Sequence, residues 1–219
     1  MKTKPRIYLV HAAAVSIPPV VASFHTNWPE AQVVNLLEDA LMTDLAADGK
    51  LTDAMTARFV HIGEYCVKAG ADAILFCCSA FGPAIEECRR QVAIPVLKPN
   101  EAMYEELVAK NGTVSLLATF QPSIPSMLTE IAAAAKAAGT TVEVRPQLVE
   151  GALDALMNNR HDEHNRLIAA AAAAQQDGAM IALAQFSMAP AKVVAAGMTK
   201  TPILTTPDSA VAKLKMLLA

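Results

Sequence analysis

The stretch ADAILFCCSAFGPA, residues 71–84, and the stretch GAMIALAQFSMAPA, residues 178–191, lie 107 positions apart and share one pattern. Each opens with an apolar run typical of a buried strand and continues into a short turn that reaches a proline. The same offset places residues 7–10 on 114–117 and residues 95–97 on 202–204. A common register across three separated segments indicates an internal duplication, because chance similarity between strands would not repeat one offset.

The other apolar runs predict how each copy folds. Strands are predicted at residues 6–11, 32–37, 73–78, 95–97, 114–119, 141–144, 180–185 and 202–205, and helices over 51–68, 122–138 and 161–176. Apolar strands that alternate with helices are typical of parallel sheets covered on both faces. The sequence therefore predicts an α/β fold of two similar three-layer α/β/α halves with mostly parallel sheets, related by a pseudo-two-fold axis. We expect the halves to be residues 1–100 plus 208–219, and residues 101–207.

The composition excludes several classes of protein. Hydrophobic residues make up 53% of the 219 residues, but no apolar run approaches the roughly 18 residues of a membrane span. The net charge of -3, without a Lys/Arg cluster, argues against nucleic-acid and membrane partners. The apolar run at residues 7–10 is too short for a signal peptide, so we predict a cytoplasmic protein.

Cysteine spacing and histidine spacing both argue against a metal site. The cysteines are Cys66, Cys77, Cys78 and Cys88, with no Cys-x-x-Cys pair, so neither a disulfide framework nor a zinc site is predicted. His161 and His164 flank two acidic residues and resemble metal ligands in composition only. We interpret them as the charged, solvated start of a helix.

Cys78 is the candidate catalytic residue. Ligands of parallel sheets bind beyond the carboxyl ends of the strands, so the duplication predicts Cys78 and Gln185 on opposite walls of one cleft. Cys77 and Cys78 point to opposite faces, and the duplication register favours Cys78. A nearby helix N-terminus lowers the pKa of a thiol, which then acts as a base or nucleophile. The alternative is that both are buried small hydrophobes, as we predict for Cys66 and Cys88.

The same strand end predicts a seat for a carboxylate. Backbone N–H groups at Ser79 and Ala80 precede a helix that Gly82 and Pro83 help to start, and such groups bind anions.

Polar residues end the first two strands as well. His11 closes the first strand, where it either contacts substrate or is a satisfied hydrogen-bonding residue. Asn35 and Glu38 lie at the end of the second strand and are candidates to line the site, although Glu38 and Asp39 equally fit the start of the next helix.

These motifs resemble those of the aspartate/glutamate/hydantoin racemase superfamily. The strand and turn at residues 71–86, with Cys78-Ser79-Ala80, and the later segments 94–96 and 100–102 resemble its first cysteine motif. Residues 114–119 with Ser123 resemble its Thr/Ser carboxylate-binding turn. Residues 177–183 followed by Ser187 resemble its second cysteine motif, so the resemblance covers nearly the whole chain.

The resemblance implies a reaction and a set of binding residues. Members need no cofactor, and two cysteines on opposite walls exchange a proton at the carbon next to the carboxylate of a small molecule. Ser79, Thr119, Ser123 and Ser187 are at the substrate-binding positions, although each alone also fits a helix cap. Many members are dimers, so the resemblance also implies a homodimer or higher homo-oligomer.

Gln185 is the departure from this pattern, because it stands where the second cysteine is expected. An amide donates and accepts hydrogen bonds but does not exchange a proton near neutral pH. One-sided chemistry by Cys78 is therefore the leading interpretation, as either proton transfer at one face or addition to a double bond.

Several alternatives stay open at this point. Arylmalonate decarboxylases and maleate cis-trans isomerases are family relatives with such chemistry, although the decarboxylases keep the cysteine of the opposite wall. A racemase that uses water or His11 as its second acid is also possible. A catalytically inactive carboxylate-binding protein is the alternative from another class.

Overall fold

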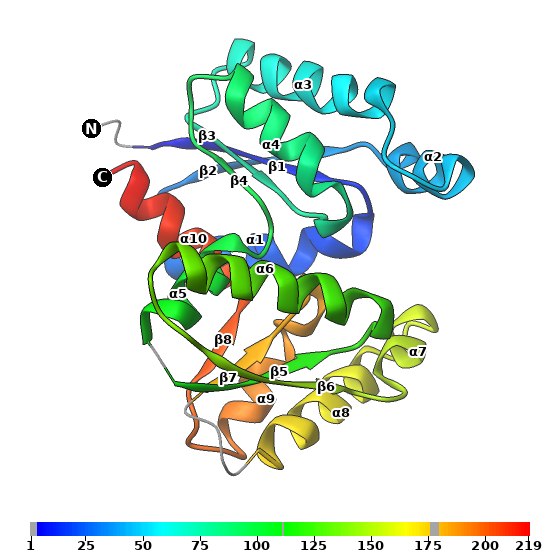
Figure 1. Ribbon diagram of the computed structural model, residues 1–219, viewed down its shortest axis with the longest axis vertical. Coiled ribbons are helices and arrows are strands. Elements are labelled where there is room, and N and C mark those ends of the chain that lie inside the picture. Colours follow the sequence, from blue (N-terminus) through cyan, green and yellow to red (C-terminus); the bar gives the residue numbers. More distant parts are fainter. Residues whose placement is uncertain (1–3, 111, 176–179) are drawn as a thin grey trace. The chain divides into compact units, whose positions relative to one another are not determined.

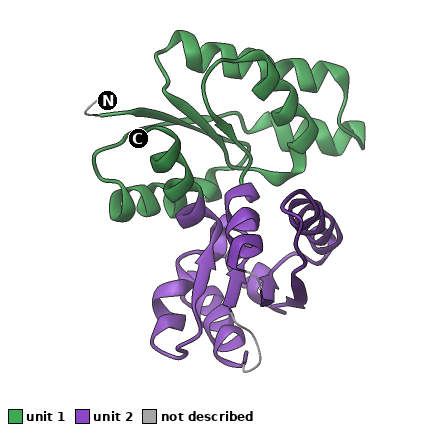
Figure 2. Ribbon diagram, turned by 60° about the vertical axis from the view of Figure 1, so that its left-hand side comes forward, with its two compact units in different colours: residues 1–99, 210–219 green, residues 100–209 purple. Residues whose placement is uncertain are grey.

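The computed structural model describes residues 4–110, 112–175 and 180–219. The chain divides into two compact units, coloured separately in Figure 2. The first unit contains Met1–Pro99 and Ala210–Ala219, and the second contains Asn100–Ser209. Each unit is described by itself below.

The first unit is a four-stranded parallel sheet with helices on both faces (Figure 1). Its strands, β1 (Arg6–His11), β2 (Gln32–Leu37), β3 (Ala73–Phe76) and β4 (Val96–Leu97), lie in the order β2-β1-β3-β4. The helices are α1 (Ile17–Asn27), α2 (Ala40–Asp48), α3 (Asp53–Lys68) and α4 (Gly82–Gln91). Short 3-10 helices, η1 (Ala14–Ser16) and η2 (Ser79–Phe81), follow β1 and β3. Figure 1 shows α3 and α4 on one face of this sheet and α1 on the other.

The second unit repeats this arrangement. Its strands, β5 (Thr113–Ala118), β6 (Glu143–Leu148), β7 (Met180–Leu183) and β8 (Ile203–Thr205), lie in the order β6-β5-β7-β8 and pair in parallel. The helices are α5 (Glu101–Lys110), α6 (Ile124–Ala137), α7 (Ala152–Met157), α8 (His161–Ala173) and α9 (Ala191–Ala196), with 3-10 helices η3 (Gln121–Ser123) and η4 (Phe186–Met188). Helix α10 (Thr206–Leu217) begins in the second unit and continues into residues of the first.

Strand pairing confirms the duplication with its offset of 107. Ile7 pairs with Ala73 in the first sheet, and the residues 107 positions later, Val114 and Met180, pair in the second. The four 3-10 helices and the starts of α1 and α6 keep the same offset. Among the strands, only β2 and β6 start at a different offset, because the second copy has four more residues before β6. Cys78 and Gln185 therefore occupy equivalent positions in the two units.

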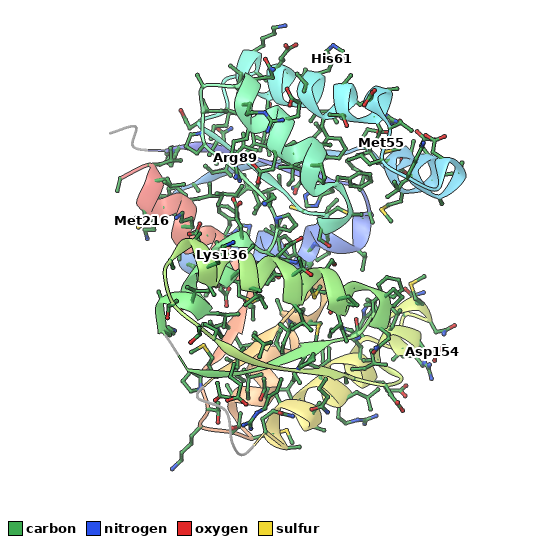
Figure 3. All side chains as sticks on the ribbon, viewed as in Figure 1. Met55, His61, Arg89, Lys136, Asp154 and Met216 are labelled. Carbon is green, nitrogen blue, oxygen red and sulfur yellow. The ribbon has the colours of Figure 1, made fainter. Side chains whose placement is uncertain are left out.

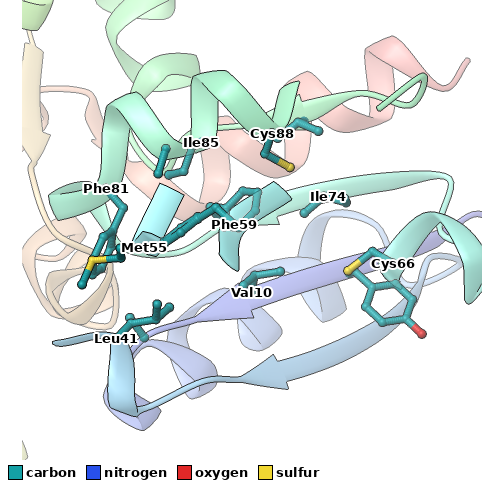
Figure 4. Packing of buried hydrophobic residues seen from close by; sticks show 14 of the residues in the cluster. Val10, Leu41, Met55, Phe59, Cys66, Ile74, Phe81, Ile85 and Cys88 are labelled. Carbon is teal, nitrogen blue, oxygen red and sulfur yellow. The ribbon is translucent and has the colours of Figure 1, made fainter. Parts of the chain in front are cut away.

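Alternating strand residues build the core of the first unit. Tyr8 and Val10 on β1 share a face with Ile74 and Phe76 on β3, and all four pack against α3 and α4 in one buried cluster. Figure 4 shows Phe59 of α3 within this cluster, where its ring centroid lies 5.3 Å from Phe76 and 4.9 Å from Phe81. Because Phe81 belongs to η2, this packing fixes the turn after β3 on the core.

The fold class is as predicted, but several element boundaries differ. β3 and β7 end two residues before the predicted limits of 78 and 185, because the chain leaves the sheet to form η2 and η4. β6 runs over Glu143–Leu148 rather than 141–144. Of the motifs used above, residues 176–179 lie outside the described part of the chain. Among the described residues, no helix has the length and apolarity needed to cross a membrane.

Candidate functional site

The carboxyl ends of two strands in each unit carry the candidate residues. In the first sheet the chain leaves β1 for β2 on one side, and β3 lies on the other side of β1. Such a change of direction separates the loops beyond the strand ends and is where open parallel sheets bind ligands. In the first unit, the turns after His11 and Phe76 lie at this point of the sheet. In the second unit, the turns after Ala118 and Leu183 lie at the equivalent point.

Cys78 lies in the turn that follows β3 and is partly exposed, whereas Cys66, Cys77 and Cys88 are buried. Its backbone is still extended, with φ -135° and ψ 122°, and η2 begins at the next residue. The Sγ atom lies 3.7 Å from Sδ of Met42, on α2. Ser79 and Ala80 are exposed beside it. Cys78 therefore presents the only accessible thiol among the four cysteines, all of which are in the described chain.

Burial raises the pKa of the Cys78 thiol, and a hydrogen bond from the backbone of Ala80 opposes that rise without cancelling it. This corrects the expectation that a helix N-terminus lowers the pKa. The physical reason is that α4 begins only at Gly82, while apolar residues surround the sulfur. Cys78 and His11 line a small pocket together with the apolar residues Val10, Ala12, Leu41, Phe59, Phe76 and Phe81. The raised pKa therefore favours the protonated form of the Cys78 thiol.

His11 is fully buried and lines the same small pocket as Cys78. Its Nδ1 lies 2.7 Å from Oγ of Ser16, and its Nε2 lies 3.0 Å from Oδ1 of Asn35. Burial lowers the pKa of the imidazole, and the contact with Asn35 partly offsets this. Both ring nitrogens have partners, as expected of a histidine that completes its hydrogen bonds at a strand end.

Asn35, within β2, and Glu38, just after it, also have partners. Asn35 binds His11, and Glu38 forms an ion pair with Arg58 of α3, which also pairs with Asp44 of α2. The ion pair between Arg58 and Asp44 therefore connects α3 to α2, the helix that contains Met42.

Gln185 joins the candidate residues of the second unit. Its Oε1 accepts a hydrogen bond from the backbone N–H of Thr119 at 3.1 Å, and its Nε2 donates to Oγ of Ser123 at 3.3 Å. The hydroxyl of Ser123 donates in turn to the carbonyl of Phe120 at 2.7 Å. The structure brings Thr119, Ser123 and Gln185 together. The Gln185 carboxamide forms hydrogen bonds with Thr119 and Ser123, the two residues that the resemblance assigns to the binding of a substrate carboxylate.

The helix-cap interpretation fails for Ser123 in one respect. It lies at the N-cap position of α6, but its hydroxyl makes no cap hydrogen bond and binds the side chain of Gln185 instead. Ser16 is the equivalent residue of the first unit, 107 positions earlier, and binds His11. The duplication register would have identified Ser16, which the sequence interpretation missed.

Ser187 lies within η4, and its carbonyl faces His164 of α8. His164 is buried, so the interpretation of a solvated helix start is wrong for this residue, although it fits the exposed His161. No group of three or more potential metal ligands occurs within the described residues. The spacing of the two histidines thus reflects one exposed and one buried side of α8.

Comparison with protein families identifies the chain. The model of the Asp/Glu/Hydantoin racemase family matches residues 6–214. The chain belongs to this family. Comparison of the racemase-family chain with curated proteins gives no match.

Solved structures share the fold of this racemase-family protein at low sequence identity. Aspartate racemase of Picrophilus torridus has a TM-score of 0.72 at 11% identity, over 97% of this chain and 93% of that chain. Glutamate racemase of Francisella tularensis in complex with D-glutamate has a TM-score of 0.64 at 13% identity, over 100% and 81%. Unliganded arylmalonate decarboxylase has a TM-score of 0.62 at 15% identity, over 98% and 93%.

Proposed function

We propose that the protein is a cofactor-independent enzyme in which Cys78 transfers a proton at the carbon next to the carboxylate of a small molecule. The observation that carries the proposal is the placement of Cys78. It is the one partly exposed thiol among the four, it follows the strand beside the change of chain direction, and the next two residues, Ser79 and Ala80, are exposed. Family membership supports an enzyme of this general class.

The raised pKa of Cys78 favours one direction of transfer. A thiol that holds its proton at neutral pH is a general acid, and it is a poor base. It would deliver the proton to one face of a planar carbanion, which forms when water takes the α-proton as a base or when a carboxylate on that carbon leaves as CO2. Apolar surroundings keep the thiol protonated before the reaction, because they disfavour the charged thiolate.

The carbanion has to be stabilised until the proton arrives. Backbone N–H groups of η2, after Cys78, are the groups of this chain best suited to hold the substrate carboxylate and to stabilise its developing negative charge. The structures of related fold include a glutamate racemase with D-glutamate bound, which is such a carboxylate.

Gln185 argues against racemisation by two thiols. Inversion at carbon needs an acid and a base on two faces, and an amide supplies neither near neutral pH. The amide is moreover held by Thr119 and Ser123. We propose that its role is to organise its own strand end rather than to transfer a proton.

A second candidate reaction, decarboxylation, is favoured by the same raised pKa. In a substituted malonate, the bond between the α-carbon and one carboxylate breaks, CO2 leaves, and the electron pair remains on the carbon as an enediolate. The thiol of Cys78 then gives its proton to that carbon, and the thiolate regains a proton from water. This reaction needs an acid on one face only. An arylmalonate decarboxylase is among the structures of similar fold.

The test is solvent-deuterium incorporation at the α-carbon, followed by NMR in D2O. We would screen D- and L-amino acids, hydantoins, and substituted malonates and other dicarboxylates, and record both exchange and CO2 release. We expect incorporation at one face, abolished in Cys78→Ala and retained in the matched control Cys88→Ala, whose thiol is buried in the core.

Two results would count against the proposal. Full turnover in Cys78→Ala would eliminate the thiol mechanism. Saturable binding of a carboxylate without exchange or CO2 release, for every compound in the screen, would favour the inactive binding protein.

A further inference from the structure

His164 is a buried ionisable residue that the proposed reaction does not use. Its side chain is 1% exposed and lies between two segments of the second unit. Nδ1 is 2.7 Å from the carbonyl oxygen of Ala152, at the start of α7, and Nε2 is 3.1 Å from the carbonyl oxygen of Ser187, in η4. One imidazole therefore bridges α7 and the turn that follows Gln185.

Both partners of this imidazole are hydrogen-bond acceptors. A backbone carbonyl has no proton to donate, so each contact requires an N–H on the ring nitrogen that faces it. A neutral imidazole carries one N–H and an imidazolium carries two. The bridge is consequently complete only in the doubly protonated state, and loss of one proton leaves one carbonyl facing a lone pair.

We propose that His164 is a proton-dependent positioning residue for η4. When the ring carries two protons it donates to Ala152 and Ser187 together and fixes the turn against α7. When the ring loses a proton, the shorter contact with Ala152 keeps the remaining N–H, and the bond to Ser187 is lost. The effect of this loss on turnover rests on the proposed function, whereas the effect on the turn does not.

Without this bond η4 keeps its own backbone hydrogen bonds and the packing of Met188, which is fully buried in one cluster with Ile168 and Ala169 of α8. Met188 N–H donates to the carbonyl of Gln185 at 3.0 Å, and Ala189 N–H donates to the carbonyl of Phe186 at 3.1 Å. Both bonds lie within the turn and do not attach it to a neighbouring helix. The contact with His164 adds a hydrogen bond to α8 beside the packing of Met188, so we expect a change there to act on the backbone of the turn that follows Gln185.

The ionisable groups around the ring are few. On its own helix they are His161, Asp162, Glu163 and Arg166, and on the packed elements they are Asp154 of α7 and Lys192 of α9. Asp154, labelled in Figure 3, pairs with Arg160, and Lys192 pairs with Asp208 at 2.7 Å. The remaining packed elements, β5 and η4, have no ionisable side chain. The protonation state of the ring therefore determines directly whether one or both carbonyls receive a hydrogen bond.

NMR on the whole protein tests the proposal without any substrate. Ring 15N shifts of His164 report its protonation and tautomer, and the backbone 15N shifts of Leu153 and Met188 report hydrogen bonding to the preceding carbonyls, Ala152 and Ser187. We expect the Met188 shift to follow the titration of the His164 ring, while the Leu153 shift changes much less. A Met188 shift that does not follow the ring would overturn the proposal, as would a neutral ring with its proton on Nε2.

Two variants separate the two bonds. His164→Gln places an amide N–H near the position of Nε2 and His164→Asn places one near Nδ1, and neither amide titrates. We expect the Met188 shift to become independent of pH in both variants. Amide exchange at Met188 should be about tenfold faster in His164→Asn than in His164→Gln, because only the glutamine retains a bond to Ser187. His161→Gln, at the exposed start of the same helix, is the matched control and should titrate as the wild type does.

The activity of these variants separates failure of this inference from failure of the proposed function. If turnover is found, its pH profile should lose the step that coincides with the His164 titration in His164→Gln but keep it in His161→Gln. An unchanged profile would contradict the link to the site, whatever the role of Cys78.

Discussion

At the scale of single residues, exposure distinguishes Cys78 from the other three cysteines. Cys66, Cys77 and Cys88 are buried, and burial raises their pKa values, to about 12 for Cys66 and about 11 for Cys88. We expect iodoacetamide to modify Cys78 first at neutral pH, at the modest rate of a largely protonated thiol. Peptide mass spectrometry of partly alkylated protein measures the order. Faster modification of Cys77 would contradict the placement of Cys78.

The pKa of Cys78 also predicts how the rate of reaction depends on pH. If the thiol acts as an acid, its active form is the protonated one, which exists below its pKa. Because burial raises that pKa, we expect activity to persist through neutral pH and to fall only as the pH rises through the raised value. A pH-rate profile under saturating substrate measures this. A rate that instead increases with pH over that range would assign Cys78 the role of a base.

Gln185 provides the complementary test. Gln185→Cys puts a thiol at the position equivalent to Cys78 and tests the expectation from the sequence that both strand ends serve one substrate. We expect α-carbon epimerisation to appear in Gln185→Cys, measured by chiral chromatography of a substrate found in the exchange screen. Gln185→Ala is the control, because it loses the same bonds to Thr119 and Ser123 without gaining a thiol. Equal epimerisation in both variants would show that the thiol is not responsible.

At the scale of elements, the close packing of α3 on α4 depends on one glycine. A Cβ atom at Gly63 would overlap Sγ of Cys88 and would approach Cγ1 of Val92 to 3.3 Å. Gly63→Ala should lower the free energy of unfolding by about 1–3 kcal/mol through overpacking, despite the gain of about 1 kcal/mol in helix propensity. Urea unfolding measures the change.

Cys88→Ala removes the atom that Gly63→Ala would overlap. We therefore expect the double variant to be more stable than the sum of the two single effects predicts, with a coupling of about 1 kcal/mol or more. Additive single effects would mean that α3 and α4 move apart without strain.

At the scale of the whole molecule, buried thiols should make the protein sensitive to alkali. The pKa values of Cys66 and Cys88 lie above the ordinary thiol value of 9.0, so the folded state keeps protons that the unfolded state releases. Their stabilising contribution is complete below the unfolded value and is lost as the pH rises toward the folded values. Each thiol should remove up to about 1.4 kcal/mol from the free energy of unfolding per pH unit in that window. Urea unfolding across the window measures it, and the double variant Cys66→Ala/Cys88→Ala should show a shallower decline.

The sequence determined the fold class of this protein. Strand alternation and helix periodicity are local properties of the sequence. A repeated offset indicates a repeated architecture, independently of which atoms the side chains contact. The register of 107 residues was therefore enough to predict two α/β units and the equivalence of Cys78 with Gln185. It also placed both residues at carboxyl ends of parallel strands.

Only the tertiary structure decided what these side chains contact. Gln185 binds groups 66 and 62 positions earlier, at Thr119 and Ser123, and the carbonyl of Ser187 faces His164 from 23 positions away. The direction of the Cys78 pKa likewise depends on burial among residues from several elements. Sequence periodicity assigns a residue to a face, whereas hydrogen bonds and desolvation depend on distances between atoms that only the packed chain brings together.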